Sequence, residues 1–190
     1  SQGRNLITHH LLGQGILPGI KTDGGLIDDP ESAGEKIPDS KGLVKLPEML
    51  AKFKAKGAVF TKWRTTQTID SVRGLPTEAN IRKNAIVQAQ EAKMTQEAGL
   101  VPIVEPEVLL DGTHDIAASY KATTRTLEIT FAGLAKEGVW LPGMILKTSM
   151  ILSGSKAENR ADSETVGFQT LKGLLKVVPA QVPAIVFLSG

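Results

Sequence analysis

Three charged residues lie at or near the ends of short apolar runs, where a buried strand would present its next side chain to a site. Lys147 follows Met-Ile-Leu, Glu105 follows Val-Pro-Ile-Val, and Lys62 lies within Phe-Thr-Lys-Trp-Arg. Burial and neighbouring cations favour the uncharged form of a lysine amine, and an uncharged amine can attack a ketone to form an imine. Lys147 is therefore a candidate nucleophile, although a lysine that snorkels at a strand end has the same pattern.

Glu105 and Glu107 form a second candidate feature, a Glu-Pro-Glu sequence directly after an apolar run. Two residues that are two positions apart on an extended strand point to the same side of the sheet. Near a group of lysines, one carboxylate can stay ionised while the other gives or takes protons, as general acid/base chemistry requires. The same spacing would also suit two surface ion-pair partners.

Lys62 and Arg64 share one side of an extended strand, so they could bracket an anionic substrate while Trp63 packs on the other side. Lys21, at the end of another apolar run, would be a further cation near Lys147. A solvated Lys/Arg pair at a strand end is the alternative interpretation.

Ser189 and Gly190 follow the last apolar run and offer a hydroxyl group and backbone N–H groups, the equipment of a phosphate site in barrel loops. A simple turn is the alternative there. The chain has no cysteine and only three histidines, His9, His10 and His114. A zinc site usually needs three converging N, O or S ligands, so we expect no metal-dependent mechanism and no cofactor.

Apolar runs and helical patterns alternate along the chain. Each run is rich in β-branched residues and predicts a strand buried on both faces. The runs span residues 16–20, 58–60, 101–104, 144–146 and 184–188. The helical patterns span residues 46–53, 78–98, 120–136 and 163–177, with Pro47 in a first turn and Thr77 as an N-cap.

One polar residue recurs every 41 to 43 positions, each time near the carboxyl end of a predicted strand. These residues are Lys21, Lys62, Glu105, Lys147 and Ser189. A repeat of one strand and one helix, without a Gly-rich phosphate loop, favours a (β/α)8 TIM barrel over a doubly wound nucleotide-binding sheet. A complete barrel needs about 250 residues. We therefore expect a single α/β domain over residues 1–190 that supplies about five βα units, with strands missing at both ends.

The composition and charge of the chain argue against a nucleic-acid-binding protein and a membrane protein. The chain is 41% hydrophobic and 22% charged, which is typical of a soluble globular domain. The net charge is only +2 and the basic residues are scattered, so no nucleic-acid partner is expected. There is no apolar stretch of about 18 residues and no signal-peptide pattern at the start. These features predict a cytoplasmic protein without a membrane partner.

The sequence resembles class I, Schiff-base-forming fructose-bisphosphate aldolases, in order and through nearly the whole chain after about residue 11. The matching motifs are Gly15-Ile-Leu-Pro-Gly-Ile-Lys21-Thr-Asp23, Phe60-Thr-Lys62-Trp-Arg64, Pro76-Thr-Glu-Ala-Asn80, Gly99-Leu-Val-Pro-Ile-Val-Glu105-Pro-Glu107, Asp111-Gly-Thr-His-Asp115, Leu146-Lys147 and Phe187-Leu-Ser189-Gly190. Several long motifs in order are more specific than any one of them. The resemblance implies a TIM barrel that reversibly cleaves fructose 1,6-bisphosphate to dihydroxyacetone phosphate and glyceraldehyde 3-phosphate, and a homotetramer.

The resemblance also implies a role for each candidate residue. Lys147 would be the Schiff-base nucleophile and Glu105 the general acid/base. Glu107 and Lys62 would be charged partners that orient these groups. Lys21 would line the site of the sugar phosphate, Lys62 with Arg64 would meet the phosphate on carbon 6, and Ser189 with Gly190 would hold the other phosphate.

Several positions depart from the family pattern. Thr148-Ser149-Met150 stands where relatives commonly show Pro-Asn-Met, and Ser153-Gly154 where Pro-Gly is usual. The family's first-strand aspartate, a phosphate-binding arginine and a C-terminal tyrosine lie outside these residues. Two alternatives therefore stay open: a related Schiff-base lyase that acts on another sugar phosphate, or an inactive fragment that serves as a binding or assembly module.

Overall fold

The computed structural model describes residues 6–39 and 41–188. In chain order, the helices are α1 (Leu6–Gly13), α2 (Lys41–Ala55), α3 (Glu78–Glu97), α4 (Ile116–Lys136), the short 3₁₀ helix Leu141–Gly143, and α5 (Ser163–Val177). The strands are β1 (Gly19–Lys21), β2 (Leu26–Asp28), β3 (Lys36–Pro38), β4 (Phe60–Gln67), β5 (Val101–Val108), β6 (Ile145–Thr148) and β7 (Ile185–Phe187).

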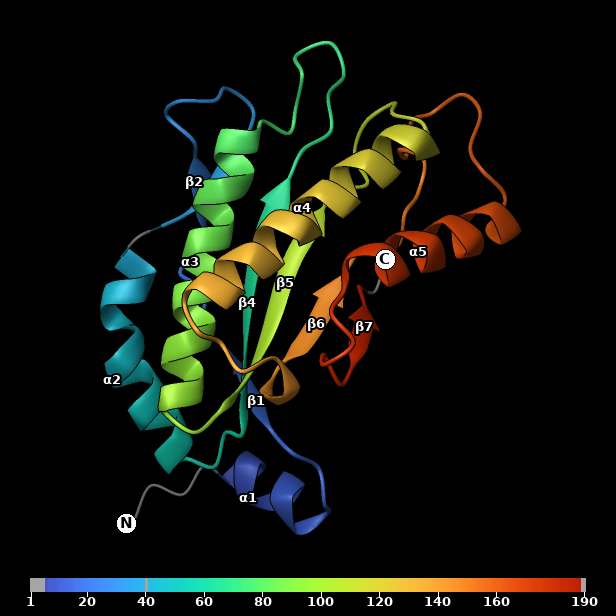
Figure 1. Ribbon diagram of the computed structural model, residues 1–190. Helices are drawn as coiled ribbons and strands as arrows, with labels where there is room; N and C mark the ends of the chain where they lie inside the picture. The colour runs from blue at the N-terminus through green and yellow to red at the C-terminus, as the bar shows by residue number, and fades with distance from the viewer. Residues whose placement is uncertain (1–5, 40, 189–190) are drawn as a thin grey trace.

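Five of these strands form one parallel sheet in the order β1-β4-β5-β6-β7 (Figure 1). Each strand pairs with the next one along the chain, apart from the separate β2–β3 hairpin, and a helix lies between consecutive strands of the sheet. This is the predicted alternation of strands and helices. Its unbroken strand order has no switch point of the kind that a doubly wound sheet contains.

Helices α2 to α5 cover one face of the sheet. On β4, β5 and β6 the laterally paired residues Trp63, Val104 and Leu146 are fully buried. Trp63 packs with residues of α2, whereas the other two join a core supplied by α3, α4 and α5. Side chains alternate along a strand, so the neighbouring residues point to the opposite face, which we call the inner face.

The prediction that every strand is buried on both faces was wrong. All three residues of β7 are exposed, as are two of the three in β1, because these strands lie at the two edges of the described sheet. In the central strands β4, β5 and β6, burial alternates over much of each strand, because helices pack on one side and charged residues lie on the other. The strands β4 and β5 are also longer than the predicted apolar runs, since they continue through polar residues.

The helix predictions were confirmed closely for α3 and α5. Thr77 caps α3 by accepting a hydrogen bond from the backbone N–H of Asn80, and Gly99 ends it with a positive φ of 72°. For α2, the predicted place of Pro47 was wrong. The helix begins at Lys41, so Pro47 lies in its second turn, where its missing N–H removes one intrahelical hydrogen bond.

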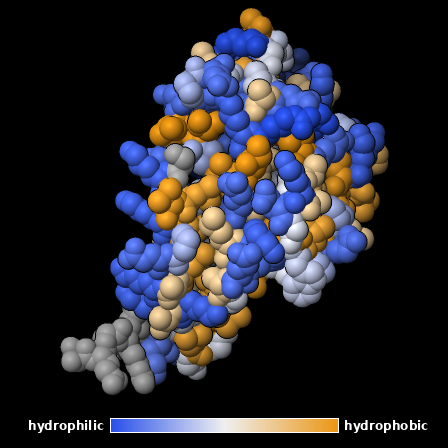
Figure 2. All heavy atoms as spheres, turned by 60° about the vertical axis from the view of Figure 1, so that its left-hand side comes forward, coloured by the Kyte–Doolittle hydropathy of each residue, from blue (hydrophilic) through white to orange (hydrophobic). Residues whose placement is uncertain are grey.

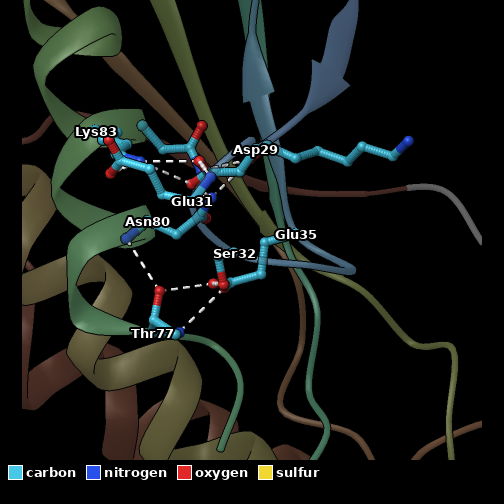
Figure 3. A network of polar contacts seen from close by, with 9 residues as sticks. Asp29, Glu31, Ser32, Glu35, Thr77, Asn80 and Lys83 are labelled. Atoms are coloured by element: carbon cyan, nitrogen blue, oxygen red, sulfur yellow. Dashed lines mark hydrogen bonds and ion pairs between the residues drawn. The ribbon is translucent and has the colours of Figure 1, made fainter. Parts of the chain in front are cut away.

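The β2–β3 hairpin was not predicted, and a polar network attaches it to the start of α3 (Figure 3). The buried Asp29 carboxylate accepts hydrogen bonds from Lys83 at 2.8 Å and from Asn80 at 2.9 Å. The hydrogen bond from Lys83 holds the pKa of Asp29 below its usual value. Glu35 accepts from the backbone N–H and the hydroxyl group of Thr77 at 3.1 and 2.6 Å. The hairpin is thereby joined to the first turns of α3.

Hydrophobic side chains lie among polar ones on the side of the molecule that Figure 2 brings forward. On α5, an exposed apolar stripe is formed by Phe168, Leu171 and Leu175 at helical spacing. No helix within the described ranges 6–39 and 41–188 is long and apolar enough to cross a membrane.

Candidate active site

Lys62, Glu105 and Lys147 project from the inner face of three adjacent strands. Lys62 is the third residue of β4, Glu105 the fifth residue of β5 and Lys147 the third residue of β6. The three residues therefore lie within the strands, whereas the sequence pattern placed them after the apolar runs. Each follows or precedes a residue that packs against the helices, so strand alternation alone sends all three to the inner face. The parallel register brings these positions together although they are about 40 residues apart in sequence.

Glu105 joins the two lysines. Its Oε2 forms an ion pair with Lys62 Nζ at 3.0 Å, and its Oε1 forms one with Lys147 Nζ at 3.3 Å. The Glu105 side chain is only 4% exposed, whereas those of Lys62 and Lys147 are 20% and 28% exposed. A buried carboxylate is thus charge-compensated by two ammonium groups, and the Lys147 amine stays accessible to a solute.

Asp23 is a second buried carboxylate at this site, with a side chain that is 5% exposed. It lies 3.4 Å from Lys62 Nζ and also forms an ion pair with Lys21. Sequence reasoning placed Asp23 in a family motif but did not propose it as a site residue. Asp23 lies two residues after the end of β1, so the same-side argument used for Glu105 and Glu107 does not extend to it.

Arg64 and Glu107 form a separate ion pair on the inner face. Lys62 and Arg64 do share this face, but their carboxylate partners differ, because Lys62 contacts Asp23 and Glu105. The joint binding of one anion by Lys62 and Arg64 stays a prediction. The predicted phosphate-binding residues Ser189 and Gly190 lie outside the described residues.

The residues that follow Lys147 connect β6 to β5. Ser149 donates a hydrogen bond to the carbonyl of Val108 at 3.0 Å and accepts one from its N–H at 3.1 Å. A cavity beside this contact is lined in part by Glu107, Ser149 and the buried His114. Burial lowers the pKa of His114, so its imidazole is neutral at pH 7. Of the unusual Thr-Ser pair, Ser149 therefore lines a cavity together with Glu107, whereas Thr148 is fully buried.

Within the part of the chain that the structure describes, no three or more Asp, Glu or His side chains are grouped so that they could hold a metal ion.

The family model for fructose-bisphosphate aldolase class-I, a glycolytic family, matches residues 1–190 of the chain. The chain belongs to the class I fructose-bisphosphate aldolase family. The match begins at residue 1, which corrects the expectation that the resemblance starts near residue 11. Fructose-bisphosphate aldolase 2 of Caenorhabditis elegans is 42% identical over 183 residues, which are 96% of this chain and 49% of that protein.

Other aldolases show the same relation. The fructose-bisphosphate aldolase of Plasmodium falciparum is 40% identical over 177 residues, 93% of this chain and 47% of that protein. A solved structure of fructose-bisphosphate aldolase from Plasmodium falciparum, in complex with TRAP and a small-molecule inhibitor, superposes with a TM-score of 0.94 at 38% identity. The superposition covers 97% of this chain and 52% of that one. The fold is that of an aldolase TIM barrel, of which these residues form five strands, and the chain spans about half the length of these relatives.

Proposed function

We propose that this chain carries the Schiff-base centre of an aldolase that reversibly cleaves fructose 1,6-bisphosphate, as in glycolysis and gluconeogenesis. The observation that supports it best is the position of Lys147 Nζ, which lies 3.3 Å from the buried carboxylate of Glu105 on the inner face. A nucleophile and a general acid/base need to lie about this close to exchange protons during imine formation. We further propose that residues 1–190 belong to one barrel domain.

In the proposed reaction, Lys147 passes a proton to Glu105, and the resulting uncharged amine attacks the ketone carbon of the sugar to form a carbinolamine. Glu105 protonates the departing hydroxyl group, and water leaves as the imine forms. The protonated imine then accepts the electron pair released when the bond between carbons 3 and 4 breaks. As the bond breaks, the hydroxyl group on carbon 4 loses its proton and becomes the aldehyde group of glyceraldehyde 3-phosphate, which leaves, while an enamine remains on Lys147. Protonation of this enamine at carbon 3 restores the imine, and its hydrolysis releases dihydroxyacetone phosphate and the Lys147 amine.

The charges on the inner face suit an anionic substrate. Three lysines, Lys21, Lys62 and Lys147, surround the two buried carboxylates of Asp23 and Glu105. This group has an excess of one positive charge when all five are ionised. We propose that Lys62 and Arg64 meet the phosphate on carbon 6, that Lys21 lines the site, and that Ser189 and Gly190 hold the other phosphate. Glu107 would orient Arg64 through their ion pair.

Borohydride trapping tests the proposed nucleophile. The complete protein that contains these residues is reduced with sodium borohydride in the presence of dihydroxyacetone phosphate and mapped by peptide mass spectrometry. We expect a stable adduct on Lys147, and we expect Lys147→Ala to lose both adduct and cleavage. Lys45→Ala, a change at an exposed lysine of α2, serves as the control. An adduct on another lysine, or normal cleavage by Lys147→Ala, would contradict the proposal.

Ser149 favours a second candidate, a related Schiff-base lyase for another sugar phosphate. Its hydroxyl group replaces the usual amide beside the nucleophile and is held by the backbone of Val108. Comparing the cleavage of the bisphosphate with that of the 1-monophosphate separates the two candidates. Equal kcat/KM for both sugars would favour the second one. The homotetramer, and the possibility of an inactive module, stay predictions to be tested by ultracentrifugation and the same cleavage assay.

A further inference from the structure

Glu91 of α3 is fully buried although it does not belong to the candidate active site. Its Oε1 accepts hydrogen bonds from the hydroxyl groups of Thr61 at 2.9 Å, Thr95 at 2.9 Å and Thr22 at 3.3 Å. Its Oε2 has no hydrogen-bond partner within residues 6–39 and 41–188. A buried carboxylate with one unpaired oxygen is unfavourable for stability, so stability alone does not account for it.

Two of these threonines connect Glu91 to the candidate active site. Thr61 directly precedes Lys62, so its side chain faces α3 while that of Lys62 faces the inner side of the sheet. Thr22 lies between Lys21 and Asp23. The backbone N–H of Thr22 donates to the Lys62 carbonyl at 3.1 Å, so the segment after β1 and the strand β4 are bonded at this level.

We propose that Glu91 is a positioning residue that holds Asp23 and Lys62 in place through the hydroxyl groups of Thr22 and Thr61. The inference rests on the proposed aldolase function, because Lys62 contacts both Asp23 and Glu105 on the inner face. A small shift of β4 against the segment after β1 would lengthen both ion pairs. Displacements of about 1 Å in an active site can reduce rates about 10²-fold.

The third threonine provides a matched control. Thr95 lies on α3 itself, four residues from Glu91, and donates to the same carboxylate oxygen. It is not adjacent in sequence to a residue of the candidate site. Thr95→Val therefore removes one hydrogen bond to Glu91 of equal length to that of Thr61, together with the 3.3 Å contact between the Thr95 and Thr61 hydroxyl groups, while it leaves both bonds from Thr61 and Thr22 to the carboxylate in place. If the carboxylate served the core alone, Thr61→Val and Thr95→Val would have the same effect.

The test compares Thr22→Val, Thr61→Val and Thr95→Val in the complete protein. We expect the first two to lower kcat for bisphosphate cleavage about tenfold, and Thr95→Val to change it by less than about twofold, with all three lowering Tm. Glu91→Leu should resemble Thr61→Val. Glu91→Gln keeps an acceptor oxygen and should recover part of the lost rate, which a loss of packing would not explain.

A second readout does not depend on cleavage. The protein is treated with limiting acetic anhydride. Peptide mass spectrometry then compares the acetylation rate of Lys62 with that of the exposed Lys45. Thr22→Val and Thr61→Val should raise the relative rate several-fold, whereas Thr95→Val should not. If the unsubstituted protein does not cleave the bisphosphate, the proposed function is wrong. The acetylation rate of Lys62 still tests the positioning role of Glu91 in that case. Equal Lys62 labelling in Thr61→Val and Thr95→Val would overturn it.

Discussion

Replacing Glu91 with glutamine should change the pH dependence of stability. The difference in free energy of unfolding, Glu91→Gln minus the unsubstituted protein, should increase as the pH rises. Burial raises the pKa of Glu91 from 4.5 to about 7, and the hydrogen bonds from Thr95, Thr61 and Thr22 only partly offset it. The nearby charge of Asp23 raises the pKa further. Because the folded-state pKa lies above the unfolded one, the carboxyl group contributes most to stability below about pH 4.5, and this contribution is lost as the pH rises through 7.

The size of this effect follows from the two pKa values. At about 1.4 kcal/mol for each pKa unit, the difference between 4.5 and about 7 corresponds to about 3 kcal/mol, most of it between pH 5 and pH 8. Glutamine has the same shape and does not ionise in this range. The free energy of unfolding of Glu91→Gln, minus that of the unsubstituted protein, should therefore increase by about 2.5 kcal/mol from pH 5 to pH 8.

Urea unfolding of both proteins at pH 5, 6, 7 and 8, at one protein concentration, measures this difference. Glu97→Gln is the control, because Glu97 lies on the same helix with a side chain that is 62% exposed. The free energy of unfolding of Glu97→Gln, minus that of the unsubstituted protein, should not change with pH. If the Glu91→Gln difference changes by less than about 0.5 kcal/mol over this range, Glu91 does not carry a raised pKa and the reasoning fails.

Three further predictions concern the site and its support. Glu105→Gln should lower kcat by about 10²- to 10⁴-fold in a cleavage assay and slow imine formation in borohydride trapping, because it removes the proposed acid/base. Thr77→Ala should destabilise the protein by about 0.5 to 2 kcal/mol in thermal or urea unfolding, because it removes the N-cap of α3. Asp29→Asn should reduce the loss of stability between pH 5 and pH 3, measured by urea unfolding. The pKa of Asp29 is lowered in the fold, so its contribution is present above its unfolded pKa of about 3.8 and is lost as the pH falls.

Local patterns predicted the helices well. For α3, Thr77 and Gly99 mark the two ends, and both signals act within a few residues of the helix. The β2–β3 hairpin has strands of only three residues, too short for a periodic pattern. Its attachment depends on contacts such as that between Glu35 and Thr77, which are 42 residues apart. Such contacts become visible only when the sheet and α3 are in place.

The sequence predicted part of the candidate site, because the spacing of some of its residues is regular. The convergence of Lys62, Glu105 and Lys147 was expected from strand ends that recur at a constant spacing, and the structure places their charged groups within 3.3 Å of Glu105. Asp23 was missed, because Thr-Asp-Gly-Gly also has the composition of a turn. Its contact with Lys62 depends on the parallel pairing of β1 with β4, which the sequence pattern does not specify by itself.

The same geometry explains why Glu91 escaped prediction. The spacing of 41 to 43 residues is the length of one strand and one helix, so residues at this interval lie within two residues of the same register position and their side chains can meet. Glu91 is on a helix, outside that series, and nothing in Ala-Gln-Glu-Ala-Lys distinguishes it from a solvent-facing residue. Its burial depends on hydroxyl groups on β4 and after β1 facing α3 at that level. A periodic pattern therefore reveals the inner face of a barrel, whereas the residues that support this face from outside require the packed structure.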